Sequence, residues 1–206
     1  MSASPTLGTM QQSTETAAWV HELIAGRWSA RGFDAAATID DAELTSILEA
    51  ARWAPTWGRI QPVRLVVGRR GDSTFGALTA SLNRGNASWA PAAAAYILVC
   101  TTDEPEDAAK HDYGAVDAGL ALSQMILQAE ALGFNGHPMA GFSKASVVEA
   151  FEIPEGVRPM AILAVGRLAE DPSSLADEIR ERDAWPRERL PLDQIAFAEH
   201  WGTPFS

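Results

Sequence analysis

YGAVDAGLALSQMILQAEAL, residues 113–132, is the longest helix signal in the chain, and Gly133 follows it as a C-cap. Its residues are small or apolar on nearly every side, and a helix of this composition is normally buried all round. In a chain of only 206 residues, burying such a helix suggests the core of a dimer. This stretch therefore decides how the rest of the chain must be arranged.

Three apolar runs before and after this helix predict strands. VRLVVG (63–68), AAAAYILVCT (92–101) and RPMAILAVG (158–166) are rich in β-branched or apolar residues, as buried strands are. GFNGHPMAGF (133–142) contains Gly, Asn and Pro and predicts a turn. Strands separated by helices point to a three-layer α/β or α+β sandwich, and these patterns leave its topology open.

The clearest short helix lies in TIDDAELTSILEAARWAP, residues 38–55. Asp40 is placed as N-cap with Glu43 three residues later, and Pro55 stops the helix. Weaker patterns predict helices over 15–25, 72–82 and 143–151.

The two ends of the chain differ from its middle in composition. Residues 1–14 are expected to be a disordered tail, and residues 15–206 form one domain. From residue 171 the sequence is charged and contains Pro and Trp, with too little apolar periodicity for a core of its own. We expect residues 171–206 to be an arm that extends over a surface.

Composition excludes several classes of function. The net charge of -11 disfavours nucleic acids and anionic membranes as partners. Cys100 is the single cysteine and lies in an apolar strand pattern, so we interpret it as a buried thiol in a cytoplasmic protein. The four histidines show no ligand spacing, so no metal is expected. GxSxG, P-loop and GxGxxG motifs are absent.

Arginines occur in two short alternating patterns. RWSARGF places Arg27, Ser29 and Arg31 on one side of an extended segment. The same alternation occurs in PRERLP, where it places Arg187 and Arg189 on one side. Two such pairs brought together would bind a dianionic phosphate through bidentate hydrogen bonds. The alternative is surface arginines paired with nearby acids, and spacing alone leaves both open.

Two loops have an unusual composition. HPMAGF offers backbone N–H groups in a Gly-containing turn, a possible anion nest or a plain loop. APTWGRIQP (54–62) places a Trp and an Arg between a helix and a strand, where an exposed linker would more often contain Ser, Asp or Asn. We therefore expect another group to lie over this second loop.

Taken in order, these segments resemble the FMN-dependent nitroreductase family. RWSARGF resembles its Arg-x-Ser-x-Arg/Lys-x-Phe segment, and AELTSILEAARWAPT its ExLxxILEAAxxAPS helix. RIQP keeps the Gln-Pro of an Asn-x-Gln-Pro element, and PMAGF matches a Pro-x-x-Gly-Phe turn. The long helix and the basic pair before Leu-Pro complete a set that covers about residues 15–200. Each motif is weak alone, but the ordered set is specific.

The resemblance implies an α+β three-layer α/β/α sandwich that forms an intertwined homodimer with exchanged C-terminal arms. It implies FMN at the interface and NADPH or NADH as donor, with hydride passing through the flavin to a nitroaromatic, quinone or similar acceptor by a ping-pong mechanism. The flavin performs the chemistry, so no catalytic side chain is expected.

The residues implied to bind the cofactor come from five segments. Arg27, Ser29, Arg187 and Arg189 would hold the phosphate, and Arg31 would approach the pyrimidine edge. The backbone of Ala140 and Gly141 would lie near N5 and O4, and residues 55–59 would come from the partner subunit. The full set is Arg27, Trp28, Ser29, Arg31, Pro55, Thr56, Trp57, Arg59, Asn83, Pro138, Met139, Ala140, Gly141, Arg187 and Arg189.

The chain departs from the family pattern at TWGR, where Ser-Ser/Thr-x-Asn is usual. Trp57 and Arg59 replace small polar residues beside the expected flavin. A Trp there can stack on the ring or close its open face, and Arg59 can attract a carboxylate or phosphate. Two alternatives to an enzyme stay open: a noncatalytic flavin-binding protein with an occluded acceptor site, and a structural dimer whose arginines make surface salt bridges.

Overall fold

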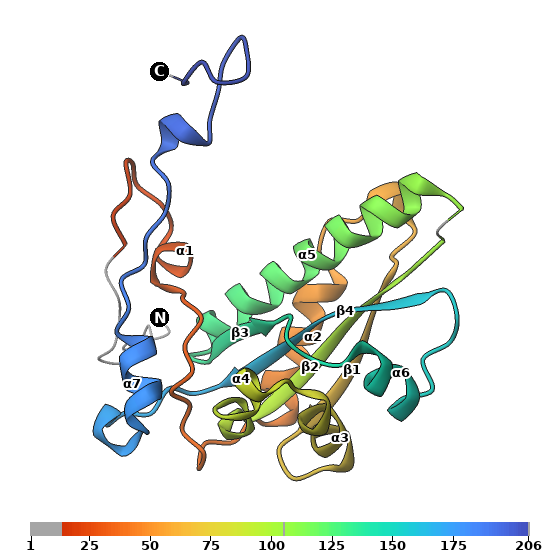
Figure 1. The fold of residues 1–206 in the computed structure, drawn as a ribbon, viewed down its shortest axis with the longest axis vertical. Helices are drawn as coiled ribbons and strands as arrows, with labels where there is room; N and C mark the ends of the chain where they lie inside the picture. The colour runs from red at the N-terminus through yellow and green to blue at the C-terminus, as the bar shows by residue number, and fades with distance from the viewer. Residues whose placement is uncertain (1–13, 105, 206) are drawn as a thin grey trace.

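A computed structural model describes residues 14–104 and 106–205, in which one antiparallel sheet forms the centre. Its strands are β1 (Val63–Arg69), β2 (Ala95–Thr102), β3 (Asn135–Met139) and β4 (Val157–Gly166), in the order β1-β2-β4-β3 (Figure 1). A register shift at Val99/Cys100 marks an irregularity between β2 and β4. The three strands expected from apolar runs are confirmed, and β3 is an additional one.

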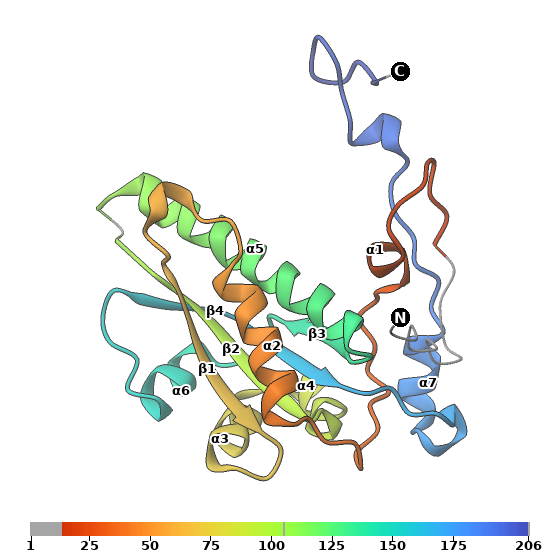
Figure 2. The same ribbon diagram turned by 180° about the vertical axis from the view of Figure 1, so that it is seen from behind.

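Helices cover both faces of this sheet (Figures 1 and 2). On one face α2 (Asp41–Arg52) and α5 (Ala108–Ala131) bury a core that includes Ile97 and Val99 of β2. On the other, α3 (Ser73–Ser81) and α6 (Lys144–Ala150) cover a core that includes Tyr96 and Leu98. Because successive strand residues point to opposite faces, β2 contributes to both cores. The expected three-layer α+β sandwich is confirmed.

Local capping explains where α2 begins. The Glu43 N–H donates to Asp40 Oδ1 at 2.8 Å, and the Asp40 N–H donates to Glu43 Oε2 at 3.0 Å. This reciprocal pair is the expected capping box. The helix ends at Arg52, three residues before Pro55, as predicted.

The central helix α5 is longer than predicted, because Asp107 caps it at Ala108 and accepts the Lys110 N–H at 3.2 Å. At its other end Gly133 has φ +77°, a conformation in which glycine avoids the Cβ clash. The helix is not buried all round within one chain: Tyr113, Val116 and Leu120 are 45%, 51% and 38% exposed. The prediction concerned the core of a dimer, and the single chain does not test it.

Two element predictions at the start and middle of the chain are wrong. The helix expected over 15–25 is reduced to α1 (Glu22–Gly26), because Trp19 is 84% exposed and gives a longer helix no packed face. The turn expected over 133–142 begins instead as strand β3, in which Pro138 is tolerated because β3 is an edge strand.

The arm beyond residue 171 extends away from the sandwich (Figure 1). It contains one helix that the sequence did not indicate, α7 (Asp177–Asp183). Many of its large apolar side chains are exposed in the single chain: Trp185, Leu190, Leu192, Ile195, Trp201 and Phe205. The expected tail, residues 1–14, lies outside the described residues except for Thr14, whose Oγ1 donates to the Ala25 carbonyl at 2.8 Å.

Cys100 is buried in β2, and burial raises the pKa of its thiol to about 11. A thiol with this pKa is mostly protonated at neutral pH, which suits a packing residue better than a nucleophile. Among the helices of the described chain, none is long and apolar enough to cross a bilayer.

Candidate functional site

Three of the predicted arginines come together at the C-terminal end of α5. Arg27 follows α1 directly, and Arg187 reaches it from the arm by donating through Nη1 to the Ala25 carbonyl at 2.7 Å. Burial lowers the pKa of Arg27, and the nearby cations Arg187 and Arg189 lower it further. Cations that lower the pKa of Arg27 lie within electrostatic range of it, so the two distant motifs form one cationic cluster.

This cluster has few protein partners. Arg27 Nη2 donates to Ser29 Oγ at 3.4 Å, and Arg189 Nη1 donates to the Glu188 carbonyl at 2.7 Å. In the part of the chain that the structure describes, no carboxylate lies within 4.0 Å of a cationic nitrogen of these three arginines. Arg27 Nε is buried without a hydrogen-bond acceptor. The simple surface salt-bridge interpretation therefore does not describe the cluster.

Arg31 behaves differently from its neighbours. Its Nη1 lies 3.8 Å from Asp183 Oδ1, and the backbone N–H groups of Arg31 and Gly32 donate to the same carboxylate at 2.8–3.0 Å. Burial raises the pKa of Asp183, and these donors oppose that shift. Helix α7 thus fixes the 31–32 backbone through Asp183, which sequence reasoning missed.

Residues 28–30 are fastened along strand β3. Asn135 Nδ2 donates to the Trp28 carbonyl at 2.8 Å, and Asn135 Oδ1 accepts the Ala30 N–H at 3.2 Å. His137 Nδ1 lies 2.8 Å from the Ala30 carbonyl, which can only accept, so Nδ1 holds the proton. The family resemblance implied that Trp28 binds the cofactor. Its side chain is 7% exposed and belongs to the packed interior.

Burial lowers the pKa of His137 to about 4, and the cations Arg31 and Arg27 contribute to this shift. His137 is therefore neutral at physiological pH. Both anchors of the 28–30 segment are uncharged, so neither neutralises the neighbouring arginines.

The Pro138–Gly141 segment meets Asn83 at the far end of β3. The Gly141 carbonyl accepts the Asn83 N–H at 3.1 Å and Asn86 Nδ2 at 3.0 Å. A Cβ on Gly141 would lie 2.2 Å from Asn83 Nδ2, so any larger residue there would require the Asn83 side chain to move. Asn83 also caps α4 (Arg84–Ala87) by accepting the Asn86 N–H at 3.1 Å. Two predicted site residues from distant segments are thus in contact.

The 55–59 loop lies elsewhere, against the N-terminal half of α5. Thr56 Oγ1 donates to Asp117 Oδ2 at 2.9 Å, and the Trp57 N–H reaches the same carboxylate at 3.1 Å. The Trp57 ring stacks on Tyr113, with centroids 5.1 Å apart and planes 5° from parallel. Arg59 is exposed and has a left-handed φ of +62°.

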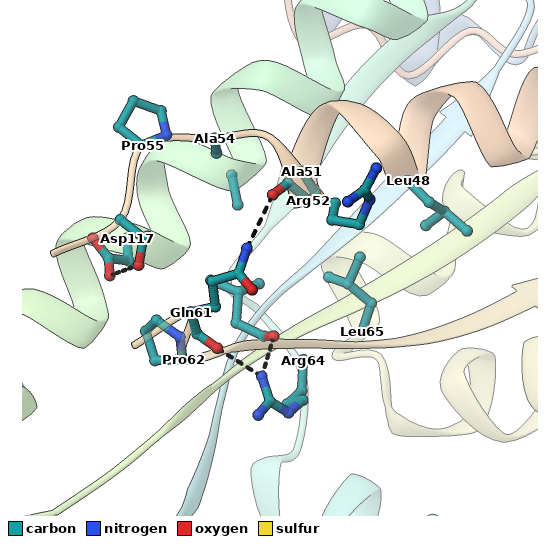
Figure 3. A pocket seen from close by; sticks show the side chains of 13 residues that line it. Leu48, Ala51, Arg52, Ala54, Pro55, Gln61, Pro62, Arg64, Leu65 and Asp117 are labelled. Atoms are coloured by element: carbon teal, nitrogen blue, oxygen red, sulfur yellow. Dashed lines mark hydrogen bonds between the residues drawn. The ribbon is translucent and has the colours of Figure 1, made fainter. Parts of the chain in front are cut away.

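A cavity of about 180 Å³ opens beneath this loop, between α2 and β1 (Figure 3). Leu48 of α2 and Leu65 of β1 face it, and Pro55 and Asp117 line its other end. Thr56 also belongs to its lining. Its lining includes none of the clustered arginines. The cavity and the cationic cluster are therefore separate features of the chain.

Two of the groups of predicted residues, the arginine cluster and the 55–59 loop, lie far apart in one chain. Asp117 and Glu130, which neighbour the two groups, are separated by 13 residues of α5, which corresponds to roughly 20 Å. Figures 1 and 2 show α1 near one end of α5 and the 53–62 segment near the other. The single chain therefore does not unite Pro55, Thr56, Trp57 and Arg59 with the arginine cluster.

Sequence reasoning overlooked Glu130, the acid nearest the cluster. Burial raises the pKa of Glu130, whereas Arg27 and Arg187 lower it. The sequence did contain a signal for Glu130, because it lies in the last turn of the helix. A carboxylate there is unfavourable beside the negative end of the helix dipole. In the described chain no group of three or more His, Cys, Asp or Glu residues is placed to hold a metal ion.

These features define a three-layer α+β protein with a cationic site at one end of its central helix. The model of the nitroreductase family matches residues 24–74 and 72–167, and the chain belongs to this family. The family resemblance inferred from the sequence is confirmed. The match ends at residue 167, so Arg187 and Arg189 lie outside it.

Individual relatives agree with this assignment. A crystal structure described as an oxidoreductase containing FMN superimposes with a TM-score of 0.82 at 33% identity, covering 92% of this chain and 96% of that chain. An uncharacterized 15.4 kDa protein of Mycolicibacterium smegmatis is 48% identical over 151 residues, which is 69% of this chain and 99% of the relative. YdgI of Bacillus subtilis (strain 168), provisionally named an NAD(P)H nitroreductase, is 25% identical over 211 residues, covering 85% of this chain and 95% of YdgI.

Proposed function

We propose that this protein is an FMN-dependent oxidoreductase that passes electrons from NADH or NADPH to an electron-poor acceptor such as a nitroaromatic or a quinone. Membership of the nitroreductase family supports the reaction class. The relative described as containing FMN supports the cofactor, and the name of YdgI supports a nicotinamide donor. We also propose that the protein works in the cytoplasm.

The observation that supports this function most directly is the state of Arg27. Its buried Nε lacks an acceptor, and two further arginines accompany one acid. The local excess of positive charge is about two, which equals the charge of a phosphate monoester at neutral pH. The residues therefore fit an FMN phosphate, which would accept hydrogen bonds from Arg27, Arg187 and Arg189.

The remaining predicted residues fit the remainder of a flavin. Bound FMN would supply reversible two-electron transfer, and the protein would supply position and charge. The Gly141 carbonyl accepts hydrogen bonds from Asn83 and Asn86, which hold the turn whose backbone would lie against the ring. Arg31, fixed through Asp183, would provide a cation near the ring. We propose that the donor and the acceptor use one exposed face of the ring in turn, as in a ping-pong mechanism.

A homodimer would unite the two groups of residues. Within one chain the 55–59 loop is roughly 20 Å along α5 from the arginines, so we propose that it contacts the flavin of the partner subunit. The exposed Tyr113, Val116 and Leu120 give α5 an apolar face for a second copy. The arm, with its six exposed large apolar residues, would cross to that copy in exchange for the partner's arm.

An absorption spectrum of the purified protein, before and after addition of NADPH or NADH, tests this proposal. We expect a yellow protein with the flavin bands, which bleach with one of the donors and return on addition of a quinone. Protein that stays colourless after FMN is supplied would refute the function. Yellow protein that neither donor bleaches would instead favour a noncatalytic flavin-binding protein, and Trp57→Ser should then restore bleaching.

A further inference from the structure

Glu130 has an unmet hydrogen-bonding requirement beside the arginine cluster. Its Oε2 is buried and has no hydrogen-bond donor. Arg27 Nε is also buried and is an unmet donor, and the two residues are close enough for each to shift the pKa of the other. Among the described residues no arginine nitrogen approaches the Glu130 carboxylate within 4.0 Å, so these complementary groups do not satisfy each other. Each needs a partner that the chain does not provide.

The position of Glu130 in α5 is not explained by helix stability. An anion in the last helical turn faces the negative end of the helix dipole, and its burial adds a desolvation cost. Gln128, two residues earlier, shows the contrast, because its Nε2 donates to Ser46 Oγ at 2.9 Å. The neighbouring polar side chain thus has a structural partner, whereas Glu130 Oε2 has none.

The two unmet groups define the chemistry of one ligand. Arg27 Nε requires an acceptor, and a phosphate oxygen beside the cationic cluster supplies it. Glu130 Oε2 requires a donor, and a hydroxyl group is the neutral donor that a short phosphate ester most readily offers. A phosphate with a hydroxyl on a nearby carbon satisfies both, whereas a phosphate on a bare hydrocarbon chain leaves the carboxylate unmet.

We propose that Glu130 is a specificity-determining residue that accepts a hydrogen bond from a hydroxyl close to the ligand's phosphate, so that the site selects phosphate esters of polyols. This inference rests on the proposed function, in which the hydroxyl belongs to the ribityl chain of FMN. A ligand that lacks the hydroxyl would bind more weakly, because the buried Glu130 oxygen would then have no hydrogen-bond donor. Leaving a buried charged group unpaired costs more binding free energy than losing a solvent-exposed hydrogen bond.

The experiment compares two ligands that share the phosphate and the ring. The full chain, freed of bound flavin, is titrated with FMN and with a flavin pentyl phosphate that lacks the ribityl hydroxyls, and flavin fluorescence reports binding. The ratio of the two dissociation constants cancels the contribution of the arginines. The variants are Glu130→Ala, Glu130→Gln and the control Glu49→Ala, which removes an exposed glutamate from the last turn of α2.

For the unmodified chain and for Glu49→Ala we expect at least about a tenfold preference for FMN, the size of one hydrogen bond to a charged group. Glu130→Ala should reduce the ratio to about one, while Glu130→Gln, whose amide oxygen still accepts, should keep an intermediate ratio. A thermal melt checks that each variant is folded.

An unchanged ratio in Glu130→Ala, or no preference in the unmodified chain, would overturn the assignment of Glu130 while leaving the proposed function intact. Failure of the unmodified chain to bind either flavin would overturn both.

Discussion

The two ends of helix α5 differ in how completely the chain satisfies its own polar groups. Near the N-terminal half, the buried Asp117 carboxylate receives the Thr56 hydroxyl and the Trp57 N–H, and the Trp57 ring stacks on Tyr113. Near the C-terminal end, Arg27 Nε and Glu130 Oε2 are buried without partners. The first region is satisfied within the single chain, whereas the second has two buried atoms without partners among the described residues.

The anchors of the two regions differ in charge as well. The 28–30 segment is attached to β3 by Asn135 and a neutral His137, so the positive charge of the neighbouring arginines stays available. The 55–59 loop is attached to α5 by an aspartate, while its cation, Arg59, is exposed. Changes in pH and single substitutions should therefore affect the two regions in different ways.

Acidification should produce the largest effect, through the neutral anchor His137. An unfolded histidine binds its proton near pH 6.5, whereas His137 in the fold does so only near pH 4. Between these values the unfolded chain binds more protons, so stability falls as the pH falls, by about 3 kcal/mol in total. Urea unfolding at pH 7, 5.5 and 4.5 measures this loss.

His137→Asn is the control for that effect, because its amide can still donate to the Ala30 carbonyl but does not titrate. We expect the variant to be less stable than the unmodified chain at pH 7 and to lose less stability between pH 6.5 and pH 4. Equal slopes for both proteins would show that His137 is not the titrating anchor.

Removing the central arginine should weaken cofactor binding next most strongly. Arg27→Ala deletes the buried, unpaired Nε and one charge of the cluster, so we expect a roughly 50- to 100-fold higher dissociation constant for FMN. Riboflavin, which lacks the phosphate, should be affected by less than about threefold. Arg180→Ala, which removes an arm arginine paired with Asp177, is the matched control and should bind FMN normally. A similar loss for both ligands would place Arg27 away from the phosphate.

Removing the anchor of the completed region should mainly reduce stability. Asp117→Ala leaves the Thr56 hydroxyl and the Trp57 N–H without their acceptor, at a cost of about 2 kcal/mol in the free energy of unfolding. Asp117→Asn keeps one acceptor oxygen and should lose about half as much. Chemical denaturation measures both values, and the preference for FMN over riboflavin should not change. A stability equal to that of the unmodified chain would mean that the loop is held by other contacts.

The smallest expected effect concerns Arg59, whose exposed charge would act on the acceptor. Arg59→Asn should lower kcat/KM for 4-nitrobenzoate by about threefold to fivefold and leave the neutral 4-nitrobenzamide unchanged, because an exposed charge is well screened. Flavin content and the rate of bleaching by the donor are the internal controls. Equal changes in kcat/KM for both acceptors would show that Arg59 does not recognise the charge of the acceptor.

Much of the fold followed from local patterns. The capping box of Asp40 and Glu43 and the apolar runs of β1, β2 and β4 depend on neighbouring residues, and each appears as expected. Strand β3 was missed because Asn, Gly and Pro favour turns locally, although pairing with β4 overrides that preference at a sheet edge. The first helix was overpredicted because apolar spacing does not show whether a packing surface exists for Trp19.

The sequence by itself determined the layered α+β class, the family and the two arginine pairs, because these are written in residues close together along the chain. Only the tertiary structure brought Arg187 to the Ala25 carbonyl near Arg27 and Thr56 to Asp117, contacts that span 162 and 61 residues. Such contacts depend on how the arm and the loop pack against α5, so no local pattern specifies them. For the same reason Glu130 was recognised only when the fold placed an unpaired carboxylate beside the arginines.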